Sequence, residues 1–214
     1  MVQSVSEPKP SESQVHEALD ALLKRVGQGD ADAWRELVAR YTDRIFGLMF
    51  RQCRDRDLAE ELTQATFVKI VTRLDGYEEL GKFEPWLFRV AMNLLRDEMR
   101  RRKRQATPMA MTPGAQRSDG PSQWAAAEKR LSEQNESSDN PLEQMEKAEQ
   151  IEIMQLAVTQ LSEDDQRILH LRHAAGLTFA QIAEMEETPL GTVLARGHRA
   201  LAKLRKLLVQ EDES

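Results

Sequence analysis

The C-terminal part of the chain carries a cationic segment with no carboxylate between Pro189 and Gln210. Its apolar residues recur every three or four positions, or at multiples of that step, which predicts a helix. Cations on such a helix can hold DNA phosphates, and side chains near its start can reach base edges. A solvated basic face on a bundle helix is the competing interpretation. The apolar residues are Leu190, Val193, Leu201, Leu204 and Leu208, and the cations are Arg196, Arg199, Lys203, Arg205 and Lys206.

Capping signals for several helices lie just ahead of this segment. A hydroxyl residue at the start of each helix can accept a hydrogen bond from a free backbone amide, and a glycine suits a left-handed stop. Helix starts so close together predict a helix-turn-helix module, a common reader of duplex DNA. The N-cap signals are Ser162 with Asp165, Thr178 with Gln181, and Thr188 with first-turn Pro189, with Gly176 as the stop and Ile182 and Ala183 as core candidates.

A second basic cluster ends a helix predicted from Pro85 to Arg104. Adjacent cations repel one another unless a polyanion neutralises them, although cations also complement the dipole at a helix C-terminus. Aromatic residues ahead of the cluster can stack on unpaired bases, but core packing is the favoured role for Trp86. The cations are Arg100, Arg101, Arg102, Lys103 and Arg104, the aromatics are Tyr77, Phe83, Trp86 and Phe88, and the expected core residues are Leu87, Val90, Ala91, Leu94 and Leu95.

Residue patterns for other chemistry are weak. His170 and His173 share a helix face, but two ligands without nearby cysteine or a suitable carboxylate favour packing or surface roles over a metal site. Cys53 is the only cysteine, so no disulfide can form within the chain. No phosphate-binding glycine loop, nucleophile elbow or metalloprotease pattern occurs. We therefore expect no catalytic activity, no metal and no cofactor.

The elements that must position these segments are all predicted to be helices, because strand-like alternation is absent. The fold class expected is all-α, with two helical domains joined by a flexible linker rich in Pro, Gly, Ser, Asn and Gln. Within the first domain, a helix from about Asp57 to Leu74 has Leu58, Leu62, Ala65, Ile70 and Val71 as core candidates. The expected boundaries are a disordered tail at 1–13, a first domain with an extra N-terminal helix at 14–104, the linker at 105–140 with a short helix near Trp124–Leu131, and a second domain at 141–210.

Composition limits the environment in which the protein works. The chain has 214 residues and a formal net charge of -6, so its acidic residues must be segregated from the basic helices. This pattern suits a protein that contacts DNA while another partner supplies most of the affinity. The longest apolar runs are too short to cross a bilayer, and the polar N-terminus has no signal-peptide core. We expect a cytoplasmic protein with no membrane partner.

Two blocks of sequence resemble the sigma-70 family of bacterial RNA polymerase initiation factors. AEELTQATFVKI, followed by FEPWLFRVAMNLLRDEMRRRKR, is similar to region 2 of the family, and LSEDDQRILHLRHAAGLTFAQIAEMEETPLGTVLARGHRALAKLRKLL is similar to region 4. The order of the blocks and the linker between them resemble the compact extracytoplasmic-function (ECF) group. The resemblance implies a factor that binds core polymerase, recognises the −10 and −35 promoter elements and promotes DNA melting. An anti-sigma protein is the usual further partner in this family.

The resemblance also implies roles for individual residues. The helix before the first basic cluster would dock on the polymerase, the cluster would read and open the −10 element beside the loop Asp75–Phe83, and the last helix would read the −35 element. For the first of these faces, a solvated acidic surface is the alternative. The implied polymerase contacts are Ala59, Glu60, Glu61, Gln64, Thr66 and Phe67, the −10 residues are Trp86, Asn93, Arg96, Arg100 and Arg101, and the −35 residues are Thr192, Ala195, Arg196, His198, Arg199 and Lys203.

The chain departs from the family pattern mainly in the second block. Leu194 and Ala195 stand where a basic residue and a serine are usual, and Glu186 and Glu187 stand where an apolar residue and glycine are usual. Carboxylates there would be repelled by phosphates, which predicts weak or atypical −35 recognition. Gly197 replaces a large aliphatic residue on the inner side of the last helix, so Gly197→Leu is expected to stabilise the second domain.

Two other functions stay open on the sequence alone. A stand-alone helix-turn-helix regulator would bind duplex DNA without polymerase. A helical interaction protein would bind only a polypeptide, and its arginine run would be a surface feature. Charge reversal at Arg100 and Arg101 separates these alternatives, because only an initiation factor would then lose open-complex formation while still binding the polymerase.

Overall fold

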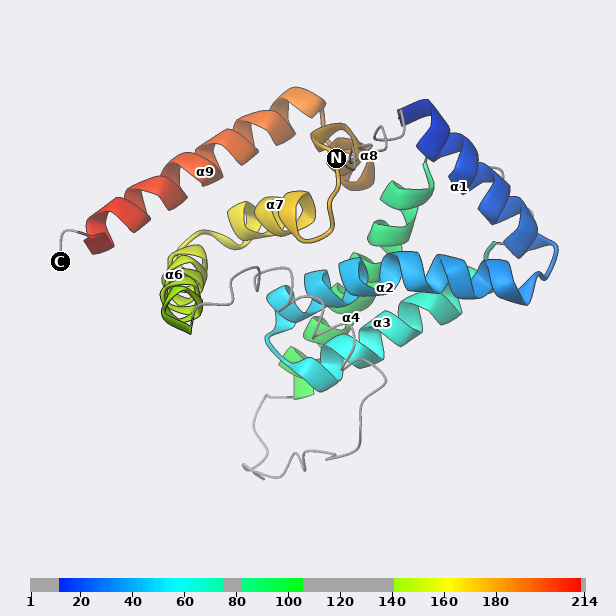
Figure 1. Cartoon of the computed structure of the whole chain (residues 1–214), viewed down its shortest axis with the longest axis horizontal. Helices are drawn as coiled ribbons and strands as arrows, with labels where there is room; N and C mark the ends of the chain where they lie inside the picture. The colour runs from blue at the N-terminus through cyan, green and yellow to red at the C-terminus, as the bar shows by residue number, and fades with distance from the viewer. Residues whose placement is uncertain (1–11, 75–81, 106–140, 213–214) are drawn as a thin grey trace, which may run out of the picture.

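The computed structural model describes residues 12–74, 82–105 and 141–212, and every regular element in these ranges is an α-helix (Figure 1). The expectation of an all-α fold is therefore confirmed. Most of the expected tail, the linker and its short helix, and most of the loop before Phe83 lie outside the described residues. The helices are α1 (Glu12–Gly27), α2 (Ala31–Cys53), α3 (Arg56–Val71), α4 (Phe83–Gln105), α6 (Pro141–Thr159), α7 (Glu163–His173), α8 (Phe179–Glu186) and α9 (Leu190–Asp212).

Helices α1 to α4 form a bundle in which α1 packs on α2, and α2, α3 and α4 pack on one another. Asp30 caps α2 by accepting hydrogen bonds from the amides of Asp32 and Ala33, and Asp55 caps α3 through the amide of Leu58. Large side chains fill the centre of this bundle, since Tyr41, Phe83 and Phe88 are fully buried. Val71, expected in this core, is 49% exposed because α3 turns it to the outer face.

The capping pattern of α7 and α8 follows the prediction. The Ser162 hydroxyl accepts from the Asp165 amide, and Thr178 and Gln181 form a reciprocal capping box. Gly176 adopts a left-handed φ of 69°, as a stop signal requires.

The start of α9 differs from the prediction. The Thr188 hydroxyl donates a hydrogen bond backward to the Glu186 carbonyl and does not cap α9. The Pro189 carbonyl accepts from the Val193 amide, and α9 begins at Leu190. The prediction was wrong by one residue because Pro189 takes the capping position itself.

The buried stripe of α9 also differs from the prediction. Leu190 and Leu201 are 45% and 42% exposed, although both belong to the apolar period from which the helix was predicted. The helix packs on α7 and α8 through small residues instead, which allows a close approach of the helix backbones. The residues on the buried stripe are Val193, Gly197 and Ala200, followed by the partly buried Leu204 and Leu207.

The two sets of helices are packed together. Helix α8 lies against α4 and α7 lies against α2, while α9 runs outward to the C-terminus (Figure 1). Buried residues of α7, α8 and α9, including Leu171, Ile182 and Val193, belong to the same apolar cluster as the core of the first bundle. The second set of helices therefore completes its core on the surface of the first.

Candidate nucleic-acid interface

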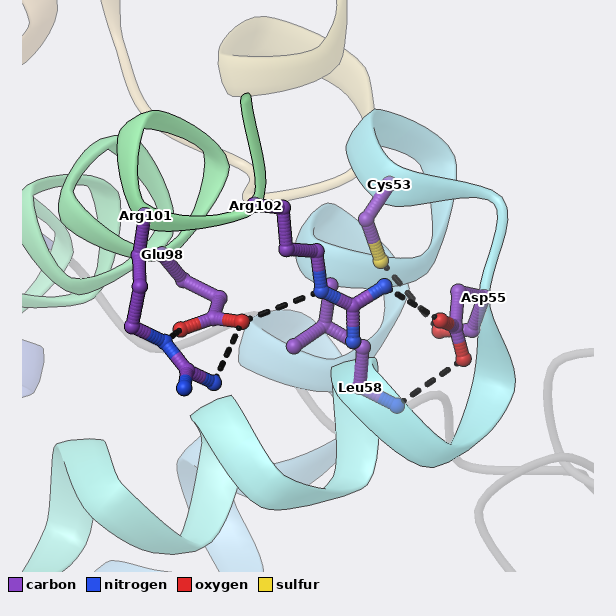
Figure 2. A network of polar contacts seen from close by, with 6 residues as sticks. All are labelled: Cys53, Asp55, Leu58, Glu98, Arg101 and Arg102. Atoms are coloured by element: carbon purple, nitrogen blue, oxygen red, sulfur yellow. Dashed lines mark hydrogen bonds and ion pairs between the residues drawn. The ribbon is translucent and has the colours of Figure 1, made fainter. Parts of the chain in front are cut away.

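The basic end of α4 is fastened to the start of α3 (Figure 2). The Glu98 carboxylate accepts hydrogen bonds from the Arg101 guanidinium at 2.6 and 2.9 Å and from Arg102 Nε at 3.0 Å. A terminal nitrogen of Arg102 also donates to Asp55 at 2.8 Å, the residue that caps α3. Hydrogen bonds from Arg101 and then Arg102 lower the pKa of Glu98, and Arg102 lowers the pKa of Asp55. Two cations of the cluster thus have a role within the fold.

The other cations of the cluster are freer. Arg100, Lys103 and Arg104 are exposed and, among the described residues, pair with no carboxylate within 4.0 Å. They line a surface hollow together with Asp97. The structure therefore divides a run of similar residues into structural guanidinium groups and cations available to a polyanion.

The remaining expected −10 residues lie earlier on α4, Arg96 and Asn93 one and two turns before Arg100 and Trp86 about four turns before it. Asn93 and Arg96 are exposed and joined by a hydrogen bond of 3.1 Å from Arg96 to the Asn93 side-chain oxygen. Trp86 is half-buried, packs against the core and has its ring centroid 5.9 Å from that of Phe83. Phe83 and Phe88 are buried, as the packing alternative requires, and Tyr77 lies outside the described residues.

The expected −35 residues lie between Thr192 and Lys203 of α9 and differ in exposure. Ala195, His198, Arg199 and Lys203 are exposed, whereas Thr192 and Arg196 are half-buried. Lys203 forms an ion pair of 2.5 Å with Asp165 in the first turn of α7, and this contact lowers the pKa of that carboxyl. Lys203 therefore fastens α9 to α7.

The expected polymerase contacts on α3 separate into buried and exposed residues. Ala59, Thr66 and Phe67 are buried, and the Phe67 ring packs edge-on against Trp34 at 6.2 Å. Their side chains hold α3 in the bundle and present no surface to a partner. Glu60 is half-buried beside Arg56. The accessible face consists of Glu61, Gln64, Val68 and Val71, with Val68 63% exposed.

Val68 was missed in the sequence. The available signal was an apolar residue lying off the inner stripe of α3, next to two polar residues already singled out. Exposed valines on a helix face contribute apolar area to a contact with another protein.

The side chains of His170 and Cys53 both make contacts within the fold. Nδ1 of His170 lies 3.0 Å from the Gln52 amide nitrogen at the contact between α7 and α2, and burial, followed by the charges of Arg51 and Arg54, lowers the pKa of His170 to about 4. The Cys53 thiol donates to the Asp55 carbonyl at 3.2 Å, and burial raises its pKa. Among the described residues, no group of three or more potential ligands is placed to hold a metal ion.

Glu186 and Glu187, the unusual residues of the helix-turn-helix, both have cationic partners. Glu186 accepts from Arg167 Nε at 2.8 Å and is nearly buried. Glu187 pairs with Arg89 of α4 at 2.8 Å, and Arg89 also donates to the Glu184 carbonyl at 2.5 Å. The prediction that these carboxylates repel DNA did not take into account their pairing with Arg167 and Arg89, which lie 19 and 98 residues away in the sequence.

A second polar contact between the two sets of helices centres on Glu84. Its carboxylate accepts hydrogen bonds from Arg44, Tyr41 and Gln181, and Arg44 Nε donates to the Ala175 carbonyl at 2.7 Å. Burial opposes ionisation of Glu84, but the hydrogen bonds and the charge of Arg44 outweigh it and lower the pKa. Neither Glu84 nor Arg89 was singled out in the sequence, because nothing local marks a contact across about 100 residues of chain.

Gly197 lies in the core as expected, but its surroundings favour the opposite effect of a larger side chain. A β-carbon at this position would lie 2.7 and 3.0 Å from two ring atoms of Phe179. The aromatic ring of α8 already fills the space that a large aliphatic residue would occupy. Gly197→Leu is therefore expected to destabilise the domain.

The chain matches known proteins along most of its length. Sigma-70 region 2 matches residues 37–105, and Sigma-70, region 4 matches residues 157–206. The chain is 30% identical to the RNA polymerase sigma factor CarQ of Myxococcus xanthus, covering 87% of this chain and 95% of that protein. It is 28% identical to the ECF RNA polymerase sigma factor SigW of Bacillus subtilis, covering 87% and 94%.

Two solved structures share the fold of this chain. The sigma factor RpoE in complex with the anti-sigma factor NepR from Bartonella quintana aligns with a TM-score of 0.56 at 21% identity, over 81% of this chain and 95% of that one. CnrH in complex with the cytosolic domain of CnrY aligns with a TM-score of 0.57 at 21% identity, over 89% and 97%. No helix within the described residues is long and apolar enough to span a membrane. The chain belongs to the ECF group of the sigma-70 family of RNA polymerase sigma factors.

Proposed function

We propose that this chain binds core RNA polymerase in the cytoplasm, directs it to promoters with −10 and −35 elements, and helps to separate the DNA strands there. The observation that carries the proposal is the presence of both sigma regions in order, each with an exposed basic helix. A stand-alone regulator would need only the second region, and an interaction protein would need neither basic helix. This chain would bind the polymerase and position it on the promoter, and it would carry out no catalytic step itself.

The outer face of α3 is the surface proposed to bind the polymerase. Glu61 and Gln64 offer polar contacts, and Val68 and Val71 offer apolar area beside them. Ala59, Thr66 and Phe67 act by holding this face in place. Glu60 contributes at its edge, where Arg56 fixes its carboxylate.

The exposed side of α4 is the surface proposed to open the −10 element. Unstacking a base costs a few kcal/mol, which stacking on an aromatic ring and nearby cations can offset. Asn93 and Arg96 are available for base and backbone contacts, and Arg100 is available for phosphate. The exposed part of Trp86 offers a stacking surface, while Arg101 contributes its charge from a side chain held by Glu98.

Helix α9 is proposed to read the −35 element. Thr192, Ala195 and His198 lie near its start, where a recognition helix contacts base edges. Arg196 and Arg199 supply phosphate contacts on the same part of the helix, and Lys203 orients the helix through Asp165. An alanine at 195 offers a methyl contact to thymine, so this proposal includes an apolar contribution to specificity.

Run-off transcription with purified core polymerase tests the proposal. The template is the DNA upstream of the protein's own operon, and transcripts are expected only when this chain is added. Arg100→Glu with Arg101→Glu should abolish open-complex formation while core polymerase is still bound in a pull-down. Arg35→Glu is the matched control, since this exposed arginine of α2 pairs only with neighbouring Asp32 in the described residues. Unchanged transcription from the double variant, or protection of an operator without polymerase, would contradict the proposal.

An anti-sigma protein is the class of regulator proposed for this chain. RpoE and CnrH, which share its fold, were each solved with a protein partner, described as an anti-sigma factor for RpoE. Affinity purification of the tagged full chain from its own cells, followed by mass spectrometry, tests for such a partner. Recovery of polymerase subunits alone would argue against it.

A further inference from the structure

The contact between α8 and α4 has polar fastenings at both ends of α8. At one end, Gln181 donates to Glu84, whose carboxylate is also held by Arg44. At the other end, Arg89 reaches the Glu184 carbonyl and the Glu187 carboxylate, and Lys82 pairs with the Glu184 carboxylate at 3.0 Å. Apolar side chains of α8, among them Ile182 and Met185, fill the space between them. The contact therefore has the paired polar rim and apolar centre of a specific interface.

The backbone at Glu187 gives independent support for a role of this residue in the contact. Glu187 ends α8 with a left-handed φ of 52°, a conformation that costs energy for any residue with a β-carbon. Glycine would adopt it without that cost. A strained residue persists where the surrounding structure or a function retains it, and the side chain of Glu187 contacts Arg89.

This arrangement brings both proposed DNA-reading surfaces to one place. Asn93 and Arg96 of α4 and Arg196 of α9 line a single cavity of about 340 Å³. That volume is at the small end of cavities that hold one small ligand. The −10 and −35 elements lie about 25 base pairs apart, or about 85 Å along B-form DNA. The closed arrangement therefore cannot read both elements of one promoter.

The covalent chain permits a more open arrangement. Residues 106–140 connect α4 to α6, and a chain of this length can span about 115 Å when fully extended. The two regions can thus separate by the distance between the promoter elements without breaking either fold.

We propose that two groups of polar contacts form an intramolecular lock that holds the free protein closed. In one group Glu84 and Arg44 hold Gln181 and the Ala175 carbonyl, and in the other Lys82 and Arg89 pair with Glu184 and Glu187. This inference rests on the proposed function, because the closed state is inactive only if both DNA elements must be read together. Core polymerase binds the separated regions, so its binding energy shifts the population from closed to open. Weakening the lock is expected to speed association with core polymerase.

Charge exchange in the full-length protein tests the lock. Arg89→Glu and Glu187→Arg each place like charges at the contact, and each is expected to raise the radius of gyration measured by small-angle X-ray scattering. Each should also speed association with core polymerase about fivefold, since a contact of this kind contributes a modest factor. The double variant restores opposite charges and should return both values toward the wild type. Arg35→Glu serves as the charge-matched control.

Glu187→Gly tests the lock without adding strain to the backbone at position 187. It removes the carboxylate and eases the backbone, so it is expected to open the protein while circular dichroism and helix content stay unchanged. Single variants that remain as compact as the wild type and associate at its rate would overturn the lock, even if transcription is normal. Variants that open, while neither they nor the wild type support run-off transcription, would uphold the lock and refute the proposed function.

Discussion

The two sets of helices bury their side chains in different ways. Helices α1 to α4 enclose a core of their own, with Tyr41, Phe83 and Phe88 fully buried. Helices α6 to α9 have a small separate cluster formed by Leu161, Leu169 and Ala200. Most of their other buried apolar residues, among them Leu171, Ile182 and Val193, belong to the core cluster of the first set. The second set therefore gains part of its stability from the contact with the first, and separating the regions must cost it that part.

Two leucines of α7 provide a matched test of this difference. Leu171 belongs to the shared core, whereas Leu169 belongs to the separate cluster. Leu171→Ala is expected to lower the free energy of unfolding by about 4 kcal/mol and Leu169→Ala by about 2 kcal/mol, since the loss grows with the cavity that remains. Urea denaturation measures both. Equal losses, or an unchanged radius of gyration in Leu171→Ala, would show that the cores are independent.

Acid should weaken the contact between α7 and α2, because His170 is buried there. Burial lowers its pKa from 6.5 to about 4, so the unfolded chain binds a proton between these values while the folded chain does not. Above about pH 6.5 the ring is neutral in both states and the free energy of unfolding is unaffected. As the pH falls below this value the free energy of unfolding decreases, and the loss reaches about 3 kcal/mol near pH 4.

Gln52, Arg51 and Arg54 face His170, and the positive charges of the two arginines disfavour the protonated ring. Denaturation at several pH values measures the slope, and His170→Gln should flatten it. His173→Gln is the control, because His173 is exposed on the same helix. A slope that persists in His170→Gln would assign the acid effect to other groups.

Packing within the second set depends on the contact between α8 and α9. Gly197→Leu is expected to lower the free energy of unfolding by about 2 kcal/mol, because Phe179 occupies the space. A companion change, Phe179→Ala, creates room and should recover part of the loss in the double variant. Thermal denaturation measures both. A raised melting temperature in Gly197→Leu alone would mean that the ring moves away without cost.

A change at the basic end of α4 tests contacts that lie wholly within the first set of helices. Glu98→Gln removes the charge shared by Arg101 and Arg102 and is expected to cost about 1 kcal/mol, because both guanidinium groups are largely exposed. Urea denaturation is the measurement, with Glu149→Gln of exposed Glu149 as the control. A loss confined to the second set would contradict the view that α3 and α4 are fastened within the first.

Features that depend on nearby residues could be predicted from the sequence. The caps at Ser162 and Thr178 and the stop at Gly176 are confirmed, because each is decided within a few residues of chain. The inward faces of α2 and α4 follow from a strong helical period of large apolar side chains.

Features decided by packing could not be predicted in the same way. On α9, the period alone allowed Leu201 as a core residue, but Gly197 leaves room for the Phe179 ring of α8, and Ala200 packs with Leu161 and Leu169. The contact of Arg102 with Asp55 likewise depends on the fold. The spacing of Glu98 to Arg101 and Arg102 on one helix was a local signal, and the prediction that treated Arg100 and Arg101 alike overlooked it. The partners of Glu84 and Arg89 come from distant parts of the chain and leave no local pattern.

Position 187 has a consequence for how this protein can evolve. Selection for an easy helix ending favours glycine there, whereas selection for a closed pair of regions favours the carboxylate. One nucleotide change separates a glutamate codon from a glycine codon. A lineage of this protein can therefore exchange intramolecular restraint for a more relaxed turn in a single mutational step.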